Sequence, residues 1–214
     1  MDSTVINGVV YPATDGQPMG ETGFHVGLVV NTFCALRWLF HRRPNVYISG
    51  DMFMYYVAGD PTQRVTPDTF VVFDVPSHER YSWFVWEEGK APDVIFEFTS
   101  RKTRSADQGT KKGLYEWLGV KEYFMFDPLG DYLRPRLQGY RLVEGAYRPI
   151  PLVAEQMESE QLGLRLKAAG NTLDLIDART GERLLPPAEE SEARRAAETE
   201  VARLRAELAR LRQG

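Results

Sequence analysis

The sequence predicts a mixed α/β fold, and two observations carry that prediction. First, the stretch from Pro92 to Pro128 reads in turn as strand, helix and strand. Second, one long helix and several strand-like segments precede this stretch. The expected order is therefore helix, strands, helix, strand, which is typical of a mixed sheet with one crossover.

The composition fits a globular chain that holds one good-sized core and an appendage. Of the 214 residues, 43% are hydrophobic and 12% aromatic. The net charge of −4 gives no whole-chain signal for nucleic acid, although it leaves room for a local basic cleft. The single cysteine, Cys34, excludes an intramolecular disulfide and a four-cysteine zinc site. Because no signal peptide or membrane-spanning apolar stretch is evident, we expect a cytoplasmic protein with no membrane partner.

The N-terminal half supplies one helix and most of the expected strands. The helix, Phe24–Phe40, is apolar most of the way round, which predicts packing on two sides. His25 in its first turn has two readings, a polar residue at a helix start or a residue at the rim of a site. Strands are expected within Val5–Tyr11, Val46–Val57, Thr69–Val75 and Tyr81–Trp86.

The stretch around residues 92–128 concentrates ionisable groups on two stripes. On the expected strand Asp93–Thr99, alternation places Asp93, Ile95, Glu97 and Thr99 on one face. Two carboxylates on a buried strand are costly unless something pairs with them. On the helix expected from about Ala106 to Leu118, one stripe carries Asp107, Lys111 and Tyr115. A strand within Glu122–Phe126 then ends at Asp127-Pro128.

The C-terminal part divides into hairpins and a charged helix. Hairpins are expected around Glu144-Gly145 and around Ala169-Gly170-Asn171. Pro186-Pro187 marks a boundary, so the predicted domains are 1–187 and a helix over 188–214. In that helix a short heptad seam is formed by Val201, Leu204, Leu208 and Leu211. The seam favours a coiled coil, but Ala-Glu-Arg tracts also form single exposed helices.

Taken in order, these residues resemble the Uma family of restriction-endonuclease-like proteins, in the PD-(D/E)xK nuclease superfamily. The motifs are weak one by one, and their order and spacing carry the resemblance. It covers roughly the first 187 residues. Its marks are Pro67-Asp68, Pro92-Asp93, Glu97, Ser100, Thr103, Arg104, Asp107, Lys111, Tyr115, Gly119-Val120, Glu122-Tyr123, Asp127-Pro128 and the segment 162–187.

The resemblance implies a restriction-endonuclease-like αβββαβ core and a metal-dependent site. Asp68 is similar to the acid of the PD half of the motif, and Glu97 to the acid of the (D/E)xK half. Mg²⁺ or Mn²⁺ would be bound by Asp68, Glu97 and the carbonyl of Phe98, because hard cations prefer oxygen ligands. Lys111 would assist the attacking water or the transition state, as a point charge does. Asp93 and Asp107 are expected in supporting positions.

The sequence departs from the usual pattern at two places. Thr99 stands two residues beyond Glu97, where a lysine is usual, and the lysine lies instead on the following helix, as Lys111. Arg101-Lys102 stands where a proline and a small residue are more usual. The missing strand lysine leaves open a second function, a noncatalytic module that binds nucleic acid or protein with the nuclease fold.

The expected activity is therefore an endonuclease that hydrolyses phosphodiester bonds, with DNA as the expected partner. A duplex has two strands, and a two-fold dimer presents one site to each. We accordingly expect a homodimer, aided by the C-terminal helix. Lys111 and Lys112 cannot point the same way on a helix, because successive residues turn by about 100°. We expect Lys111, on the stripe of Asp107 and Tyr115, to face the cleft.

Overall fold

The computed structural model describes residues 3–12, 23–100 and 102–211. The chain divides into two compact units, the first ending at Leu184 and the second starting at Leu185. The second unit contains one long helix, α4 (Pro187–Leu211). No helix in the described part of the chain is long and apolar enough to span a bilayer.

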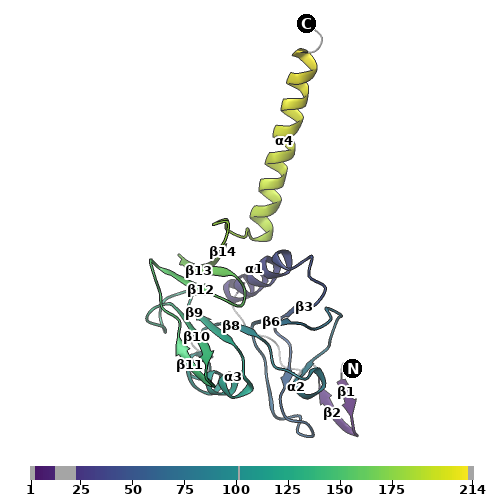
Figure 1. Cartoon of the computed structure of the whole chain (residues 1–214), viewed down its shortest axis with the longest axis vertical. Helices are drawn as coiled ribbons and strands as arrows, with labels where there is room; N and C mark the ends of the chain where they lie inside the picture. The colour runs from purple at the N-terminus through teal and green to yellow at the C-terminus, as the bar shows by residue number, and fades with distance from the viewer. Residues whose placement is uncertain (1–2, 13–22, 101, 212–214) are drawn as a thin grey trace. The chain divides into compact units, whose positions relative to one another are not determined.

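A six-stranded sheet organises the first unit (Figure 1). Neighbouring strands are antiparallel, except β8 and β9, which are parallel. The connection between these two passes through η1 (Ala106–Lys111) and α3 (Lys112–Leu118). In spatial order the strands are β11 (Ala146–Pro149), β10 (Leu137–Val143), β9 (Glu122–Phe126), β8 (Val94–Phe98), β6 (Thr69–Phe73) and β3 (Val46–Ser49).

The order of elements along this sheet is the αβββαβ core that the family resemblance implied. It runs through α1 (Gly23–Leu39), β3, β6, β8, α3 and β9. The hairpin of β10 and β11 around Glu144-Gly145 then extends the sheet. The mixed α/β prediction is thus confirmed, including the crossover and the C-terminal helix.

Two apolar layers cover the two faces of the sheet. Because strand side chains alternate, Val94, Phe96 and Phe98 point to the layer that contains α1. Ile95 points to the opposite layer, where Tyr115 of α3 packs. Figure 1 shows α1 and α3 on opposite sides of the sheet. Glu97, which alternates with Phe96 and Phe98, therefore faces the α3 layer.

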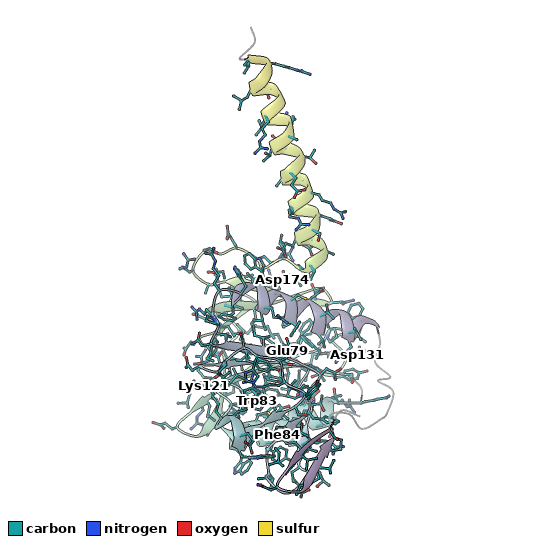
Figure 2. All side chains as sticks on the ribbon, turned by 90° about the vertical axis from the view of Figure 1, so that its right-hand side faces the viewer. Glu79, Trp83, Phe84, Lys121, Asp131 and Asp174 are labelled. Atoms are coloured by element: carbon teal, nitrogen blue, oxygen red, sulfur yellow. The ribbon has the colours of Figure 1, made fainter. Side chains whose placement is uncertain are left out.

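Three small sheets complete the first unit. An N-terminal hairpin packs through Tyr11 against Tyr55 and Phe84, and Figure 2 shows Phe84 beside it. Another small sheet contributes Leu164, Leu166 and other side chains to the α1 layer. The strands are β1 (Ser3–Ile6) with β2 (Val9–Pro12), β5 (Arg64–Val65) with β4 (Met54–Tyr55) and β7 (Trp83–Phe84), and β12 (Gln156–Ser159) with β13 (Leu164–Ala169) and β14 (Thr172–Asp177).

Three expected strands differ from the structure. Val5–Tyr11, expected as one edge strand, is a hairpin of β1 and β2, because the chain turns at Asn7-Gly8, where both residues have positive φ. Val46–Val57 is not one strand, because the chain breaks at Gly50-Asp51, where Asp51 has a positive φ of 51°. Tyr81–Trp86 forms only β7 before it turns into the short helix α2 (Val85–Glu88). Gly89, with φ of 74°, ends that helix. All three segments are rich in β-forming residues, and local turns override that propensity.

Candidate active site

Asp68 lies just before β6 and is held there by two neighbouring segments. At Gly50 a side chain would overlap the carbonyl oxygen of Asp68, so the close approach requires glycine. The amide of Asp51 donates to the carbonyl of Pro67 at 2.9 Å. The amide of Phe98, at the end of β8, donates to Asp68 Oδ2 at 2.6 Å. Asp68 is therefore fixed against the end of the strand that carries Glu97.

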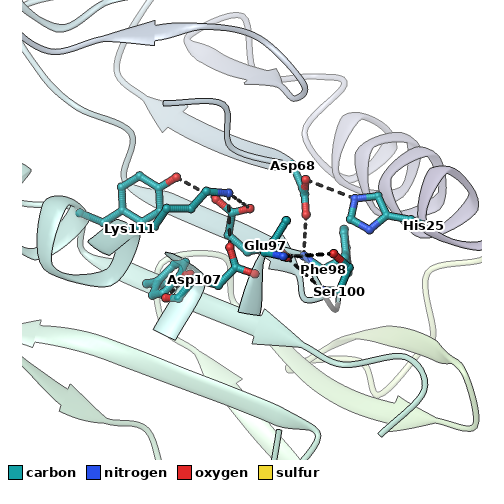
Figure 3. Close-up of polar contacts among 10 residues, drawn as sticks. His25, Asp68, Glu97, Phe98, Ser100, Asp107 and Lys111 are labelled. Carbon is teal, nitrogen blue, oxygen red and sulfur yellow. Dashed lines mark hydrogen bonds and ion pairs between the residues drawn. The ribbon is translucent and has the colours of Figure 1, made fainter. Parts of the chain in front are cut away.

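Glu97 is buried on the α3 side of β8, with 2% of its surface exposed. Lys111 Nζ donates to its Oε2 at 2.8 Å, and the hydroxyl of Tyr115 donates to its Oε1 at 2.7 Å. Figure 3 shows Lys111 and Asp107 converging on this carboxylate from the crossover segment. In the sequence, Tyr115 stands on the helical stripe and among the marks of the resemblance, with no role assigned to it, and its hydroxyl contact makes it a further member of the site.

The crossover begins with a π-helical turn, and that turn supplies two of the charged groups. π-Helical turns are rare and often occur at functional sites. Within η1, Lys111 Nζ lies 3.3 Å from Asp107 Oδ1, and Asp107 is fully buried. Lys112 points elsewhere, since its Nζ lies 3.7 Å from the ring centroid of Tyr140. The structure thus brings Lys111, and not Lys112, to Glu97.

Three carboxylates, of Asp68, Glu97 and Asp107, lie near one ammonium group, that of Lys111, and this affects the pKa values of the group. Burial raises the pKa of Glu97 to about 8, with repulsion from Asp68 and Asp107 adding to the shift and Lys111 opposing it. Burial likewise raises the pKa of Asp107. Burial alone would lower the pKa of Lys111, but Glu97 and Asp107 outweigh it and raise that pKa. Lys111 therefore stays an ammonium at neutral pH, whereas Glu97 is readily protonated.

His25 joins the site from α1. Its Nε2 lies 3.3 Å from Asp68 Oδ1, and its side chain is 9% exposed (Figure 3). Its ring also meets Phe98 edge-on, with centroids 6.1 Å apart. Of the two sequence readings of His25, the geometry favours the one that places it at a site. Asp51 is a further neighbour, because burial and then the charge of Asp68 raise its pKa.

Asp93 has a different set of partners from Glu97. Its Oδ2 accepts from Lys90 Nζ and from the amide of Phe73, each at 2.7 Å, and its Oδ1 lies 2.7 Å from Lys121 Nζ. These contacts tie the start of β8 to β6 and to the turn before β9. None of these contacts joins Asp93 to Asp68 or to Lys111.

Thr99, which stands where a lysine is usual, is buried at the end of β8. Thr99 is 2% exposed, and its hydroxyl finds no hydrogen-bond partner among the described residues. No ammonium is supplied from that position, and Lys111 approaches Glu97 from the crossover instead. Arg101 lies outside the described residues. Nearby, Ser100 and Thr103 form a small turn, in which the Ser100 amide donates to Thr103 Oγ1 at 3.0 Å.

Comparison with known proteins now identifies the family. The model of the Uma2 family, described as "Putative restriction endonuclease", matches residues 5–171. The chain belongs to this family. A search of curated proteins gave no significant match. Among solved structures, a putative nuclease belonging to DUF820 from Anabaena variabilis ATCC 29413 is similar, with a TM-score of 0.50 and 14% identity over 75% of this chain and 82% of that one. At this identity the likeness concerns the fold.

The donor chemistry of this Uma2 site fits a hard divalent cation. Asp68 and Glu97 offer carboxylate oxygens, and a bound cation would oppose the burial and the repulsion from Asp68 and Asp107 that together raise the pKa of Glu97. Within the described residues no three Asp, Glu, His or Cys side chains group closely enough to hold a metal ion alone. The remaining ligands would therefore be carbonyls, such as that of Phe98, and water. In the structure, Lys111 and Tyr115 donate hydrogen bonds to Glu97.

Proposed function

We propose that this chain is a metal-dependent endonuclease that hydrolyses phosphodiester bonds of DNA. The observation that supports the proposal most is the group of Asp68, Glu97 and Lys111 at one end of the central strands of a restriction-endonuclease-like fold. Buried carboxylates with raised pKa values beside a fixed ammonium group are typical of catalytic sites.

In this proposal each residue has one role. Asp68, Glu97 and the carbonyl of Phe98 would hold Mg²⁺ or Mn²⁺. When bound, the cation would neutralise charge on the phosphate and favour hydroxide formation from water. Lys111 is an ammonium held by two carboxylates, so it is suited to attract the phosphate or steady developing charge and is unsuited to act as a base. Tyr115 and Asp107 would orient Glu97 and Lys111, and His25 would orient Asp68.

Plasmid cleavage tests this function. Purified full-length protein should nick or linearise plasmid DNA with Mg²⁺ or Mn²⁺, and EDTA should stop the reaction. Asp68→Ala and Glu97→Ala should each lower the rate by at least about a thousandfold. Asp131→Ala, which removes an exposed carboxylate from a loop, serves as the matched control and should cut like the wild type. Equal cutting by all four proteins would refute the proposed site.

The noncatalytic alternative rests on Thr99 and on the present contacts of Glu97. The position of the usual strand lysine lacks a cation, and both oxygens of Glu97 are already engaged. A binding module would bind DNA equally well with or without Mg²⁺ or Mn²⁺ and would not cut single-stranded or plasmid DNA. That combination of results would favour this alternative over the nuclease.

We further propose that the protein acts as a homodimer to which α4 contributes. Four apolar residues of its heptad seam, Val201, Leu204, Leu208 and Leu211, are between 45% and 74% exposed within the described structure. Leu204→Glu should weaken the dimer in sedimentation experiments, whereas Ala202→Glu, off the seam, should not. A wild-type protein that is monomeric at micromolar concentration would contradict the proposal.

A further inference from the structure

A cavity lies where α1 turns into β3, at the edge of the six-stranded sheet. Its volume is about 520 Å³, and its polar lining includes Arg37, His41, Arg42, Arg43, Ser77 and Glu79. Figure 1 shows α1 leading into β3 on this side of the sheet. β3 is the terminal strand of the sheet order, so the described residues supply no further strand along its outer side.

The cavity is basic, although the chain as a whole is acidic. Residues 23–50 contain three arginines and no aspartate or glutamate, in a chain of net charge −4. The guanidinium groups of Arg37 and Arg43 each lie 5.4 Å from the centroid of a phenylalanine ring, of Phe33 and Phe40 respectively. Stacking of this kind orients a guanidinium while leaving its donors available.

The arginines lack compensating charge in their surroundings. Within the described part of the chain, none of Arg37, Arg42 and Arg43 has a carboxylate within ion-pair distance. Glu79 is the acidic residue in the lining and would oppose an anion. With three exposed guanidinium groups against one carboxylate, the balance favours an anionic ligand.

The basic cavity continues toward the candidate active site. It shares Phe33 and Ser49 with a neighbouring cavity of about 300 Å³, which is also lined by Gly50, Asp51 and Asp68. Val46, beside the arginines, pairs with Phe73 across the β3–β6 ladder. Phe73 lies five residues beyond Asp68, which is about 17 Å along a strand. That length corresponds to about five nucleotides of a duplex.

We propose that Arg37, Arg42 and Arg43 bind the phosphate backbone of the nucleic-acid strand, about five nucleotides from the bond that reaches Asp68. This inference rests on the proposed function, because it takes the substrate to be DNA. A polymer with a phosphate at every nucleotide can occupy the basic cavity and the acidic site together. The continuity of the two cavities therefore favours DNA over a membrane surface, whose headgroups would need to reach only the arginines. Backbone contacts set the position of the strand without reading its sequence.

DNA binding without cleavage tests the inference. Full-length protein in EDTA is titrated against a fluorescently labelled 20-base-pair duplex at several salt concentrations. Arg42→Gln/Arg43→Gln should bind roughly tenfold more weakly at physiological salt and should reduce the slope of log K against log salt by about 2. The matched control, Arg148→Gln/Arg179→Gln, removes two exposed arginines from β11 and from the turn after β14, and should leave both values near wild type. Arg42→Lys/Arg43→Lys keeps the charge and should keep the wild-type slope.

Each outcome decides the inference separately from catalysis. If the arginine pair and its control bind alike while the wild type cuts plasmid, the phosphate site is wrong and the nuclease proposal stands. If the pair loses DNA binding and Glu97→Ala still cuts, the phosphate site stands and the catalytic proposal fails. Unchanged DNA binding with loss of binding to phosphatidylserine vesicles would make the cavity a membrane contact and overturn the inference. Should Arg42→Gln/Arg43→Gln fail to fold, Arg37→Gln/Arg42→Gln gives the same comparison.

Discussion

The buried carboxylates at the two ends of β8 have pKa values that are shifted in opposite directions. Asp93, directly before β8, and Glu97, within it, lie four residues apart on the same face of the strand and are 1% and 2% exposed. Burial would raise the pKa of Asp93, but Lys121, Lys90 and the amide of Phe73 outweigh it and lower that pKa. At Glu97 burial prevails and raises the pKa to about 8. The two side chains are almost equally exposed, and the two ends differ in the number of their partners and in the depth of those partners: Lys90 and Lys121 are 31% and 53% exposed, whereas Lys111 is 17% exposed.

Two other fully buried carboxylates, Glu122 and Asp127, resemble Asp93 in having several partners. Glu122 is bound by Arg141 at 3.0 Å, by the hydroxyl of Ser159 at 2.5 Å and by backbone amides. Asp127 accepts from the amides of Leu129, Gly130, Tyr132 and Leu133. At Glu97 and Asp107, by contrast, two buried carboxylates share one ammonium group. The comparison teaches that unbalanced negative charge, more than buried charge, distinguishes the candidate site.

Beyond the loss expected for Asp68→Ala and Glu97→Ala, the next largest expected effect on cleavage distinguishes two adjacent lysines. Lys111→Ala should lower DNA cleavage by at least about a hundredfold, because it removes the ammonium beside Glu97. Lys112→Ala removes a cation that lies over Tyr140, and should leave cleavage within about threefold of the wild type. Single-turnover rates for the two variants measure the difference. The reverse ranking would show that the lysine of the site is misassigned.

The next effect concerns stability at the other end of the strand. Asp93→Asn should lower the free energy of unfolding by about 3 kcal/mol, because it leaves Lys90 and Lys121 beside a neutral group. The folded fraction should still cut DNA. Urea denaturation of this variant beside Glu97→Gln measures the contrast, and the Glu97→Gln protein should be at least as stable as the wild type above pH 8. An Asp93→Asn protein that is stable but inactive would move Asp93 into the site.

Much of this comparison could be predicted from the sequence, because strand alternation and helical spacing are local properties. Asp93 and Glu97 fall on one face of β8 by alternation alone, and Lys111 and Asp107 share a stripe by spacing. The number of lysine side chains that reach each end of β8 could not be predicted from local spacing. Lys121 reaches Asp93 from 28 positions away, so only the assembled sheet shows the pairing.

The parts of the site that sequence reasoning left open depend on contacts between distant segments. His25 meets Asp68 only because α1 packs across the end of β8, and no local pattern links the two residues. Tyr115 was visible on its stripe, but its hydroxyl bond to Glu97 follows from the register of the crossover. In the fold, the β-forming run at Tyr81–Trp86 is divided because Val85–Glu88 turns into a helix.

A further expected effect is a dependence of stability on pH that belongs to Glu97. Its pKa is about 8 in the folded protein and about 4.5 in the unfolded chain, so between these values the folded state binds the extra proton. In EDTA, this residue should make the protein progressively less stable as pH rises from about 4.5 to about 8. The difference in unfolding free energy between wild type and Glu97→Gln isolates the effect. A difference that stays flat across that range would contradict the raised pKa.

Calorimetric titration with Mn²⁺ tests most directly the claim that unbalanced charge at Glu97 serves a cation. We predict one site in the wild type, with an affinity that rises with pH up to about 8 and with protons released into the buffer below that pH. Glu97→Gln should lose the site and the proton release, and Asp93→Asn, measured where it is folded, should keep both. Mn²⁺ binding that is equal in wild type and Glu97→Gln, or lost only in Asp93→Asn, would contradict the account.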